Sequence, residues 1–252
     1  ADPVEFNFDM VDADIKACEV AKKMKNDPVF FSPKNIGAPV NTRFEEVNPV
    51  ISGDGKTLAF TRKLQFYDAV FITEKDENGN WKEPYNLTPD FGVDGNTYTT
   101  GISYFGDELF LYRSDDYDGN IYSSRKTSNN WTTIRKLNDH INTKYWESHA
   151  TPSNDGQFLY FSSNRAGGYG GLDIYKSKKG TNGDWGAPVN LGPVINTPDN
   201  EDTPFLGNDG FSLFFSSQNH GTMGDFDIYI STLRSDGTWG KPRNMGYPVN
   251  ST

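Results

Sequence analysis

The sequence predicts an all-β protein built from four similar sheets of four strands, and two observations support this prediction. Four segments of the 252-residue chain align with one another, and a tryptophan recurs in each segment, at Trp81, Trp131, Trp185 and Trp239. These tryptophans are 50, 54 and 54 residues apart, and a propeller blade of four strands takes about 40–50 residues. The segments also consist of short apolar runs separated by Gly- and Asp-rich turns. The expected fold is therefore a β-propeller with long loops.

The composition agrees with a folded chain of many short strands. Aromatic residues make up 14% of the chain, which also contains 25 Gly and 14 Pro. Disordered chains are poor in aromatic residues, so the mean hydropathy of −0.70 does not predict disorder. The formal net charge is −10, and an acidic surface repels phosphate backbones, so we expect no nucleic-acid partner. No apolar run approaches the length that spans a membrane, so we expect no direct membrane span.

The first half of each repeat is predicted to be a hairpin. The four repeats cover residues 48–87, 100–137, 150–191 and 202–245. The first strand ends at a turn in which Asp54, Asp155 or Asp209 lies beside a glycine, and glycine adopts positive φ at little cost. The second strand alternates large apolar residues, as Leu159 and Phe161 do, which places one face in the core between neighbouring blades.

The second half of each repeat supplies the third and fourth strands. In two repeats the third strand reads Asp-Ile-Tyr, starting at Asp173 and Asp227. We expect these carboxylates to accept hydrogen bonds from backbone amides of the neighbouring turn. A polar turn then leads to the recurring tryptophan and to a fourth strand that contains Pro84, Pro188 or Pro242. Proline has no amide hydrogen and is tolerated on an edge strand, which is the place of the fourth strand in a blade.

Residues 1–27 are expected to be a helical segment, and residues 28–252 the propeller. Residues 10–26 place Ile15, Cys18, Ala21 and Met24 on roughly one helical face. The helix is either the end of a TPR array or residues left from cloning. Because the tail NIGAPVNT of residues 35–42 matches the tails of the third and fourth repeats, residues 29–40 are interpreted as an extra outer strand. That strand belongs either to a ring of five or more blades, which we prefer, or to the outer edge of a four-bladed ring.

The third repeat carries a distinctive motif. It reads SSNRAGGYGGLDIY at residues 162–175 and continues as GDWGAPVNLGPVINT. This pattern resembles the WD40-like repeat (PD40) of TolB-type propellers. It is similar in particular to the propeller of Bacteroidota TPR–propeller–OmpA-like proteins, a group that includes the PorE-type lipoprotein of the type IX secretion system. The resemblance covers about residues 28–252, and the first two repeats follow the pattern less closely.

This resemblance implies a non-catalytic scaffold that is periplasmic, associated with the outer membrane and bound to protein partners of the cell envelope. It implies a component of the type IX secretion system or a related OmpA-family lipoprotein, with no cofactor. Members of the group carry a lipidated N-terminal cysteine and a peptidoglycan-binding domain, neither of which lies within these 252 residues. Association with peptidoglycan is therefore expected only through a domain outside them. The competing interpretation is a secreted glycan-binding or glycan-hydrolysing propeller.

Departures from the repeat are the best candidates for a binding face, because a binding site is usually asymmetric. In three repeats an acidic residue or a histidine lies three residues before a proline of the first strand, and the second repeat has a tyrosine at this place. First strands begin near the rim of the central channel of a propeller. The predicted partner-binding rim consists of Glu46, Tyr98, Tyr145, Trp146, His149 and Glu201.

The sequence offers little for a metal ion. The three histidines occupy different repeat positions, so they do not predict a zinc site. The loop at residues 115–120 places oxygen-bearing side chains at alternate positions, as calcium loops do, so Asp116, Asp118 and Asn120 form a candidate calcium site. The aligned loops lack these carboxylates, and a solvated loop is the simpler interpretation.

A sialidase-type glycosidase is the main enzymatic alternative, and we expect no enzymatic activity. Such enzymes need an arginine trio and a Tyr–Glu pair. Arg62, Arg113 and Arg165 recur near the end of the second strand, and repetition favours a structural role. The discriminating observation is whether these arginines and Arg234 converge on one face or remain in separate blades.

Overall fold

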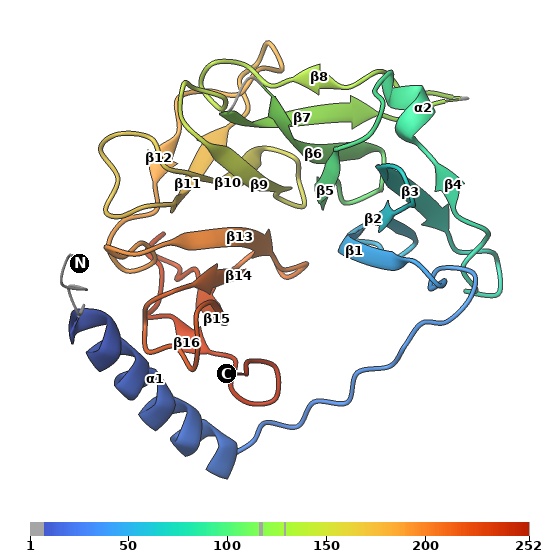
Figure 1. Cartoon of the computed structure of the whole chain (residues 1–252). Coiled ribbons are helices and arrows are strands. Elements are labelled where there is room, and N and C mark those ends of the chain that lie inside the picture. Colours follow the sequence, from blue (N-terminus) through green and yellow to red (C-terminus); the bar gives the residue numbers. More distant parts are fainter. Residues whose placement is uncertain (1–7, 116–117, 129, 252) are drawn as a thin grey trace, which may run out of the picture.

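The computed structural model describes residues 8–115, 118–128 and 130–251. The described residues form four antiparallel sheets of four strands each. The sheets are arranged around a common axis as the blades of a propeller, with helix α1 (Phe8–Asn26) outside the ring (Figure 1). The predicted fold class and the predicted helix are confirmed.

The strands of each blade follow one another along the chain from the centre of the ring outward (Figure 1). Blades 1 and 2 consist of β1 (Glu45–Ile51), β2 (Thr57–Lys63), β3 (Asp68–Glu74) and β4 (Tyr85–Asn86), then β5 (Tyr98–Ile102), β6 (Glu108–Asp115), β7 (Asp118–Arg125) and β8 (Arg135–Lys136). Blades 3 and 4 consist of β9 (Glu147–Pro152), β10 (Phe158–Ser163), β11 (Asp173–Lys178) and β12 (Val189–Asn190), then β13 (Glu201–Leu206), β14 (Ser212–Ser217), β15 (Asp227–Thr232) and β16 (Arg243–Asn244). A short helix, α2 (Thr88–Phe91), lies in the connection between blades 1 and 2.

The aspartate of the first turn closes the inner hairpin of each blade. In blade 1, Oδ1 of Asp54 accepts hydrogen bonds from the Ser52 hydroxyl at 2.6 Å and from the Lys56 amide at 3.0 Å. The bond from Ser52 is the main reason that the pKa of the Asp54 carboxyl is lowered. Asp155 accepts the equivalent pair from Ser153 and Gln157, and Asp209 accepts bonds from the amides of Phe211 and Ser212. The repeated aspartates therefore fix the register of the first two strands.

Three apolar seams hold consecutive blades together. Between blades 2 and 3, Phe110 and Ile121 pack against Leu159, Phe161 and the recurring Trp185. All of these side chains are buried. The period-two alternation of the strands places these residues on the facing sides of two sheets. Each seam is thus closed by the tryptophan of the following blade.

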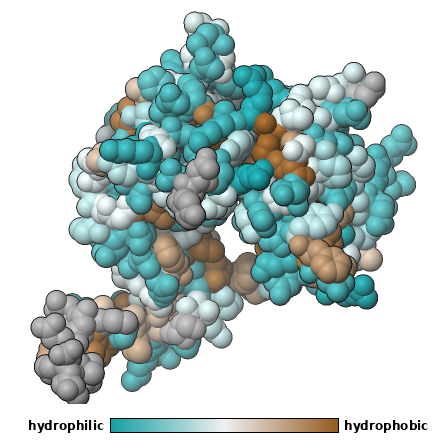
Figure 2. Space-filling model, turned by 45° about the horizontal axis from the view of Figure 1, so that its top comes forward, coloured by the Kyte–Doolittle hydropathy of each residue, from teal (hydrophilic) through white to brown (hydrophobic). Residues whose placement is uncertain are grey.

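Blades 1 and 4 share no apolar seam within the described part of the chain. The cluster on the free side of blade 1 contains Val40, Leu58 and Phe60 and no residue of blade 4. The first turns of the two blades are joined by a hydrogen bond of 3.0 Å from Nδ2 of Asn208 to the Gly53 carbonyl. The ring is open on this side in Figure 1. Figure 2 shows a hollow between two lobes of the surface, with hydrophobic residues along its border.

The extra outer strand expected at residues 29–40 is not formed in this structure. Residues 27–36 are coil without a strand assignment. The segment contacts the propeller through a hydrogen bond of 2.8 Å from the Val29 amide to the Tyr247 carbonyl. A strand requires a partner ladder for its amides and carbonyls, and no third strand of a further blade lies beside this segment among the described residues.

Only part of the surface of helix α1 is buried. Ala21 is buried, whereas Phe8, Val11, Ile15 and the free Cys18 are exposed. Of the predicted apolar face, Ala21 is therefore covered and Ile15 and Cys18 are not. Neither helix within the described ranges is long and apolar enough to cross a membrane.

Candidate interaction rim

Buried or largely buried glutamates anchor the rim end of three blades. Glu46, Glu147 and Glu201 lie at or near the start of the innermost strand and pair with the end of the second strand. Each carboxylate accepts two hydrogen bonds from the threonine four residues earlier, one from its amide and one from its hydroxyl. These carboxylates hold the incoming connector against its blade. Glu46 and Glu201 therefore act as anchors within the fold, and their place in a binding face stays a prediction.

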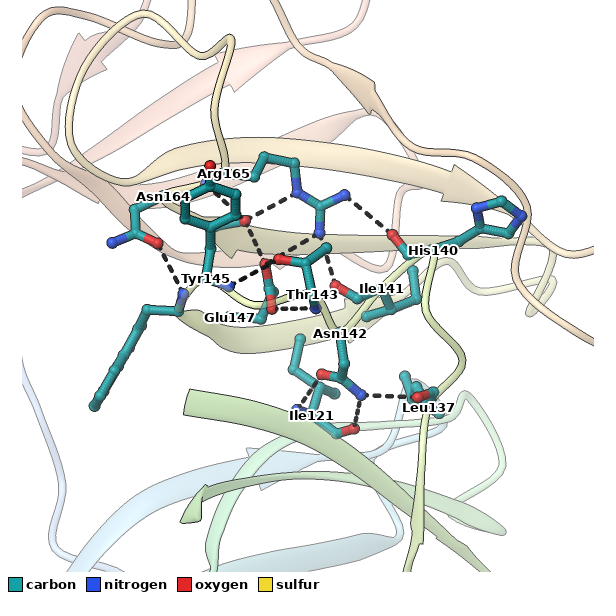
Figure 3. Close-up of polar contacts among 12 residues, drawn as sticks. Ile121, Leu137, His140, Ile141, Asn142, Thr143, Tyr145, Glu147, Asn164 and Arg165 are labelled. Atoms are coloured by element: carbon teal, nitrogen blue, oxygen red, sulfur yellow. Dashed lines mark hydrogen bonds and ion pairs between the residues drawn. The ribbon is translucent and has the colours of Figure 1, made fainter. Parts of the chain in front are cut away.

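Arg165 completes this anchor in blade 3 (Figure 3). Its Nη2 atom lies 3.3 Å from Oε1 of Glu147 and donates to the Ile141 carbonyl at 2.7 Å. Its Nη1 atom donates to the His140 carbonyl at 3.0 Å. Burial lowers the pKa of the Arg165 guanidinium. The arginine thus ties the connector and the buried glutamate into one polar network.

The other arginines are bound within or next to their own blades. Arg62 repeats the anchor in blade 1, with Nε 2.9 Å from Glu46 and Nη2 2.9 Å from the Val40 carbonyl. Arg113 pairs with an aspartate of the connector into blade 2, and Arg234 bonds a threonine of its own turn. Each of the four arginines thus remains with partners of its own blade or of the adjoining connector, which favours a structural role over a shared carboxylate site.

Strand pairing corrects the position that we predicted for His149. Glu46 pairs with Arg62, and its structural counterpart in blade 3 is Glu147, which pairs with Ser163. His149 is instead the residue that bulges from the innermost strand, with a φ of 32°. Asn48 and Thr203 hold the same bulge in blades 1 and 4. In those blades a proline directly follows the bulged residue, whereas in blade 3 the proline, Pro152, lies further along the strand. Counting back three residues from Pro152 therefore gives His149 and not Glu147.

Tyr98 is likewise not the counterpart of the glutamates in blade 2. It pairs with Tyr112, whereas the counterpart of Glu46 would pair with Arg113, so Tyr98 lies one position further along its strand. This offset brings three aromatic rings into a row, which we call the aromatic row: Tyr98, Tyr112 and Trp146. The ring centroids are 6.2 Å apart for the two tyrosines and 5.6 Å apart for Tyr112 and Trp146. Trp146 remains 37% exposed. The row lies where blades 2 and 3 meet, at the rim.

Neighbouring groups fix the two ends of the aromatic row. The Tyr98 hydroxyl donates to Oδ2 of Asp68 at 2.8 Å, and burial together with this bond raises the pKa of Tyr98 to about 12. At the other end, Gly119 lies under the Trp146 indole, and a Cβ atom there would be 2.7 Å from Cδ2 of Trp146. Only glycine leaves room for the ring in this place.

The backbone around Trp146 is also held. The Trp146 amide donates to Oδ1 of Asn164 at 2.8 Å, and its carbonyl accepts from the Asn164 amide at 3.2 Å. The amide of Tyr145 donates to the Thr143 hydroxyl at 3.1 Å, and the Tyr145 side chain is half-buried (Figure 3). Trp146 is therefore presented on a fixed backbone.

His149 and Asp202 form a polar pair across the next seam. Nδ1 of His149 lies 3.0 Å from Oδ1 of Asp202, which also accepts from the Ser148 hydroxyl at 3.0 Å. Burial opposes ionisation of Asp202, but the bonds from His149 and its neighbours outweigh it and lower the pKa of the carboxyl. Sequence reasoning found His149 and missed Asp202 and Tyr112, which have no distinctive motif around them.

The recurrent Asp173 and Asp227 are buried at the start of the third strands. Each accepts a hydrogen bond from a backbone amide four residues earlier and one from an asparagine of the outer strand.

Of the candidate calcium ligands, Asp116 lies outside the described residues. Nδ2 of the buried Asn120 donates to Asp115 at 2.8 Å. The described ranges contain no group of three or more His, Cys, Asp or Glu side chains arranged to hold a metal ion.

Comparisons with known proteins support the fold. No family model and no curated protein sequence matches the chain. The crystal structure of TolB from Acinetobacter baumannii is similar, with a TM-score of 0.59 and 15% identity over 85% of this chain and 46% of that one. A structure assigned as TolB from Agrobacterium tumefaciens has a TM-score of 0.55 and 20% identity over 78% of this chain and 63% of that one. The chain thus has a TolB-like propeller fold and spans less than two thirds of either protein.

Proposed function

We propose that this propeller is a non-catalytic interaction module that binds a protein partner through the aromatic row. The observation that carries the proposal is the exposed Trp146, held on a fixed backbone beside Tyr112. Aromatic side chains dominate the binding energy of many protein interfaces. A ring that is already ordered loses little conformational entropy when a partner binds.

The aromatic row is specific to the seam between blades 2 and 3. Thr61, Ser162 and Ser216 take the place of Tyr112 in the second strands of the other blades. Glu45 and Asn200 precede the anchoring glutamates where blade 3 has Trp146. A feature that departs from the repeat in this way is not needed to build a blade, which supports a binding role.

The charge around the aromatic row favours a partner with basic side chains. Burial is the main cause that raises the pKa of the Tyr112 hydroxyl, and the nearby carboxylates of Asp115 and Asp202 add to it. Asp68 binds the hydroxyl of Tyr98. Lysine or arginine of a partner would meet aromatic faces and carboxylates together, which combines cation–π and ionic attraction.

The cellular setting is proposed from the sequence motif of the third repeat. Its resemblance to the Bacteroidota TPR–propeller–OmpA-like group supports a periplasmic, outer-membrane-associated protein. A component of the type IX secretion system, or of a related OmpA-family lipoprotein, fits that resemblance. The partner is then a protein of the cell envelope, and any contact with peptidoglycan passes through a separate domain.

Site-specific crosslinking tests this proposal. A photo-crosslinking residue replaces Trp146 in one variant and Phe105, an exposed residue of a first turn, in a control. We expect an envelope protein to crosslink at position 146 and not at position 105. The purified partner should then bind wild type and Phe105→Ala equally, and Trp146→Ala at least about tenfold more weakly. Equal binding by all three proteins, or hydrolysis of a sialoside or aryl-glycoside, would contradict the proposal.

A further inference from the structure

The free face of blade 4 has the composition of a seam but lacks the blade that would cover it. Ile228 on β15 occupies the position of Ile121 and Ile174 on the third strands of blades 2 and 3. Those two isoleucines are 0% exposed, whereas Ile228 is 41% exposed. Phe205 on β13 and Phe226 before β15 are exposed as well. Apolar side chains thus remain in solvent at positions that the other seams bury.

The connectors between blades show the same incompleteness on the side of blade 1. Asn142, Asn196 and Asn250 each bind the amide and the carbonyl of one isoleucine on the third strand that the chain has just left. Asn41 holds this position in the segment before blade 1, and its Oδ1 accepts from the Gly37 amide at 3.1 Å. No third strand lies beside Asn41 within the described ranges. The side chain of Asn41 therefore occupies the position of a connector asparagine, but it has no third strand to bind.

The segment before this asparagine has the register of an outer strand. Asn35 caps the Gly37 amide at 2.7 Å, as the last residues of β12 and β16 cap the glycines that follow them. Counted back from Asn35, Phe30 has the position of Trp185 and Trp239. Those tryptophans are 5% and 8% exposed, whereas Phe30 is 96% exposed. Phe30 is thus the counterpart of a seam tryptophan, but it has no neighbouring blade to pack against.

This segment already touches the connector that leaves blade 4. In the seam between blades 2 and 3, Nδ2 of Asn138 donates to the Trp185 carbonyl at 2.7 Å. Gly246 is the counterpart of Asn138 in the connector after blade 4, and a Cβ atom on it would be 3.1 Å from Val29. The Val29 amide donates to the next carbonyl, that of Tyr247. The segment therefore lies against the connector as the outer strand of the next blade would.

We propose that the open side is the seat of a fifth blade, whose outer strand is supplied by residues 34–35 of this chain. Its other three strands form an antiparallel meander of the same repeat type. They pair with residues 34–35, receive Phe30 as the seam aromatic, bind Asn41 through their third strand and cover Ile228 and Phe205. The hydrogen bond between Asn208 and Gly53 is given up when the blade enters.

The experiment supplies the three strands from the chain itself. A copy of residues 198–238, which contains the first three strands of blade 4, is fused after residue 252 of the full chain. The reporter is Ile228→Cys in a Cys18→Ser background, because Cys18 is the only cysteine. We expect thiol labelling at position 228 to slow by at least about tenfold in the fused chain relative to the unfused one. Equal labelling rates in the two chains would overturn the proposal.

A second measurement tests the predicted place of Phe30. Phe30→Ala should lower the Tm of the fused chain and leave the Tm of the unfused chain unchanged. Phe66→Ala, which also removes an exposed phenylalanine, is the matched control and should be neutral in both chains. If Phe30→Ala has the same effect in both chains, the outer-strand assignment is wrong even where the cysteine is protected.

Discussion

Nδ1 of His149 lies 3.0 Å from Oδ1 of Asp202, so a histidine of blade 3 and an aspartate of blade 4 meet across their seam. The Ser148 hydroxyl binds the same oxygen. Because these bonds lower the pKa of Asp202, the carboxyl ionises more readily in the folded chain than in the unfolded chain. The stability that it contributes is present above its unfolded pKa of about 4 and is lost as the pH falls through the lower folded value.

We therefore predict that Asp202→Asn lowers the free energy of unfolding at pH 7 by about 1–2 kcal/mol, because a neutral amide replaces a charged acceptor and hydrogen bonds to charged groups are the stronger ones. The substitution should also flatten the decline of stability at acidic pH. Urea unfolding between pH 7 and pH 3 measures both effects. Asp94→Asn, which changes an exposed carboxylate, is the control, and a variant with the wild-type pH profile at position 202 would refute the assignment.

Glu147→Gln should destabilise the protein more than Glu201→Gln. Both glutamates are buried and bind a threonine and a serine, but Glu147 also pairs with the largely buried Arg165. Removing one partner of a buried ion pair costs about 3–5 kcal/mol, whereas the loss at Glu201 is expected to be about 1–3 kcal/mol. Chemical denaturation of the two variants gives the comparison, and equal losses would show that Arg165 contributes nothing.

Trp185→Ala should cost about 3–5 kcal/mol of unfolding free energy, because it opens a cavity in the seam between blades 2 and 3. Trp81 has the same position in blade 1, where the neighbouring side is open, and it is only partly buried. Trp81→Ala should therefore cost clearly less. The midpoints of thermal or urea unfolding of the two variants give the comparison. A larger loss of stability for Trp81→Ala than for Trp185→Ala would mean that the open side of blade 1 is in fact closed.

Gly119→Ala should displace Trp146 while the blades stay intact. The added Cβ atom conflicts with the Trp146 indole and with the ring of Tyr112, and the indole is free to move outward. We expect a red shift of tryptophan emission and at least about tenfold weaker partner binding. In a Trp146→Ala background the same glycine substitution should leave the emission unchanged, and an effect there would place the cause elsewhere.

Much of the propeller could be predicted because repetition makes its pattern visible. The spacing of Trp81, Trp131, Trp185 and Trp239 defined the blades, and the alternation of the second strands defined the seams. The bulge of the innermost strand could not be predicted, since one extra residue leaves no periodic signal. His149 was aligned with Glu46 because the count started from Pro152, which lies further along its strand than Pro49 does, so Glu147 is the true counterpart.

The sequence does contain a signal for the anchors that we missed. A threonine precedes Glu46, Glu147 and Glu201 by four residues in every case, and this spacing identifies Glu147 without a structure. The aromatic row has no such signal, because Tyr98 and Tyr112 meet only through strand pairing and Trp146 joins them only when blade 3 packs against blade 2. Asp202 was likewise hidden, since its role depends on a residue of another blade.

The outer strands β4, β8, β12 and β16 each contain two residues, and this brevity affects how molecules meet in solution. A long unpaired strand at the circumference is a template for another chain, and such templates lead to aggregates. Two paired residues leave few free amides and carbonyls in a row, and proline interrupts the approach to three of these strands. The perimeter of the ring therefore resists sheet extension by neighbouring copies.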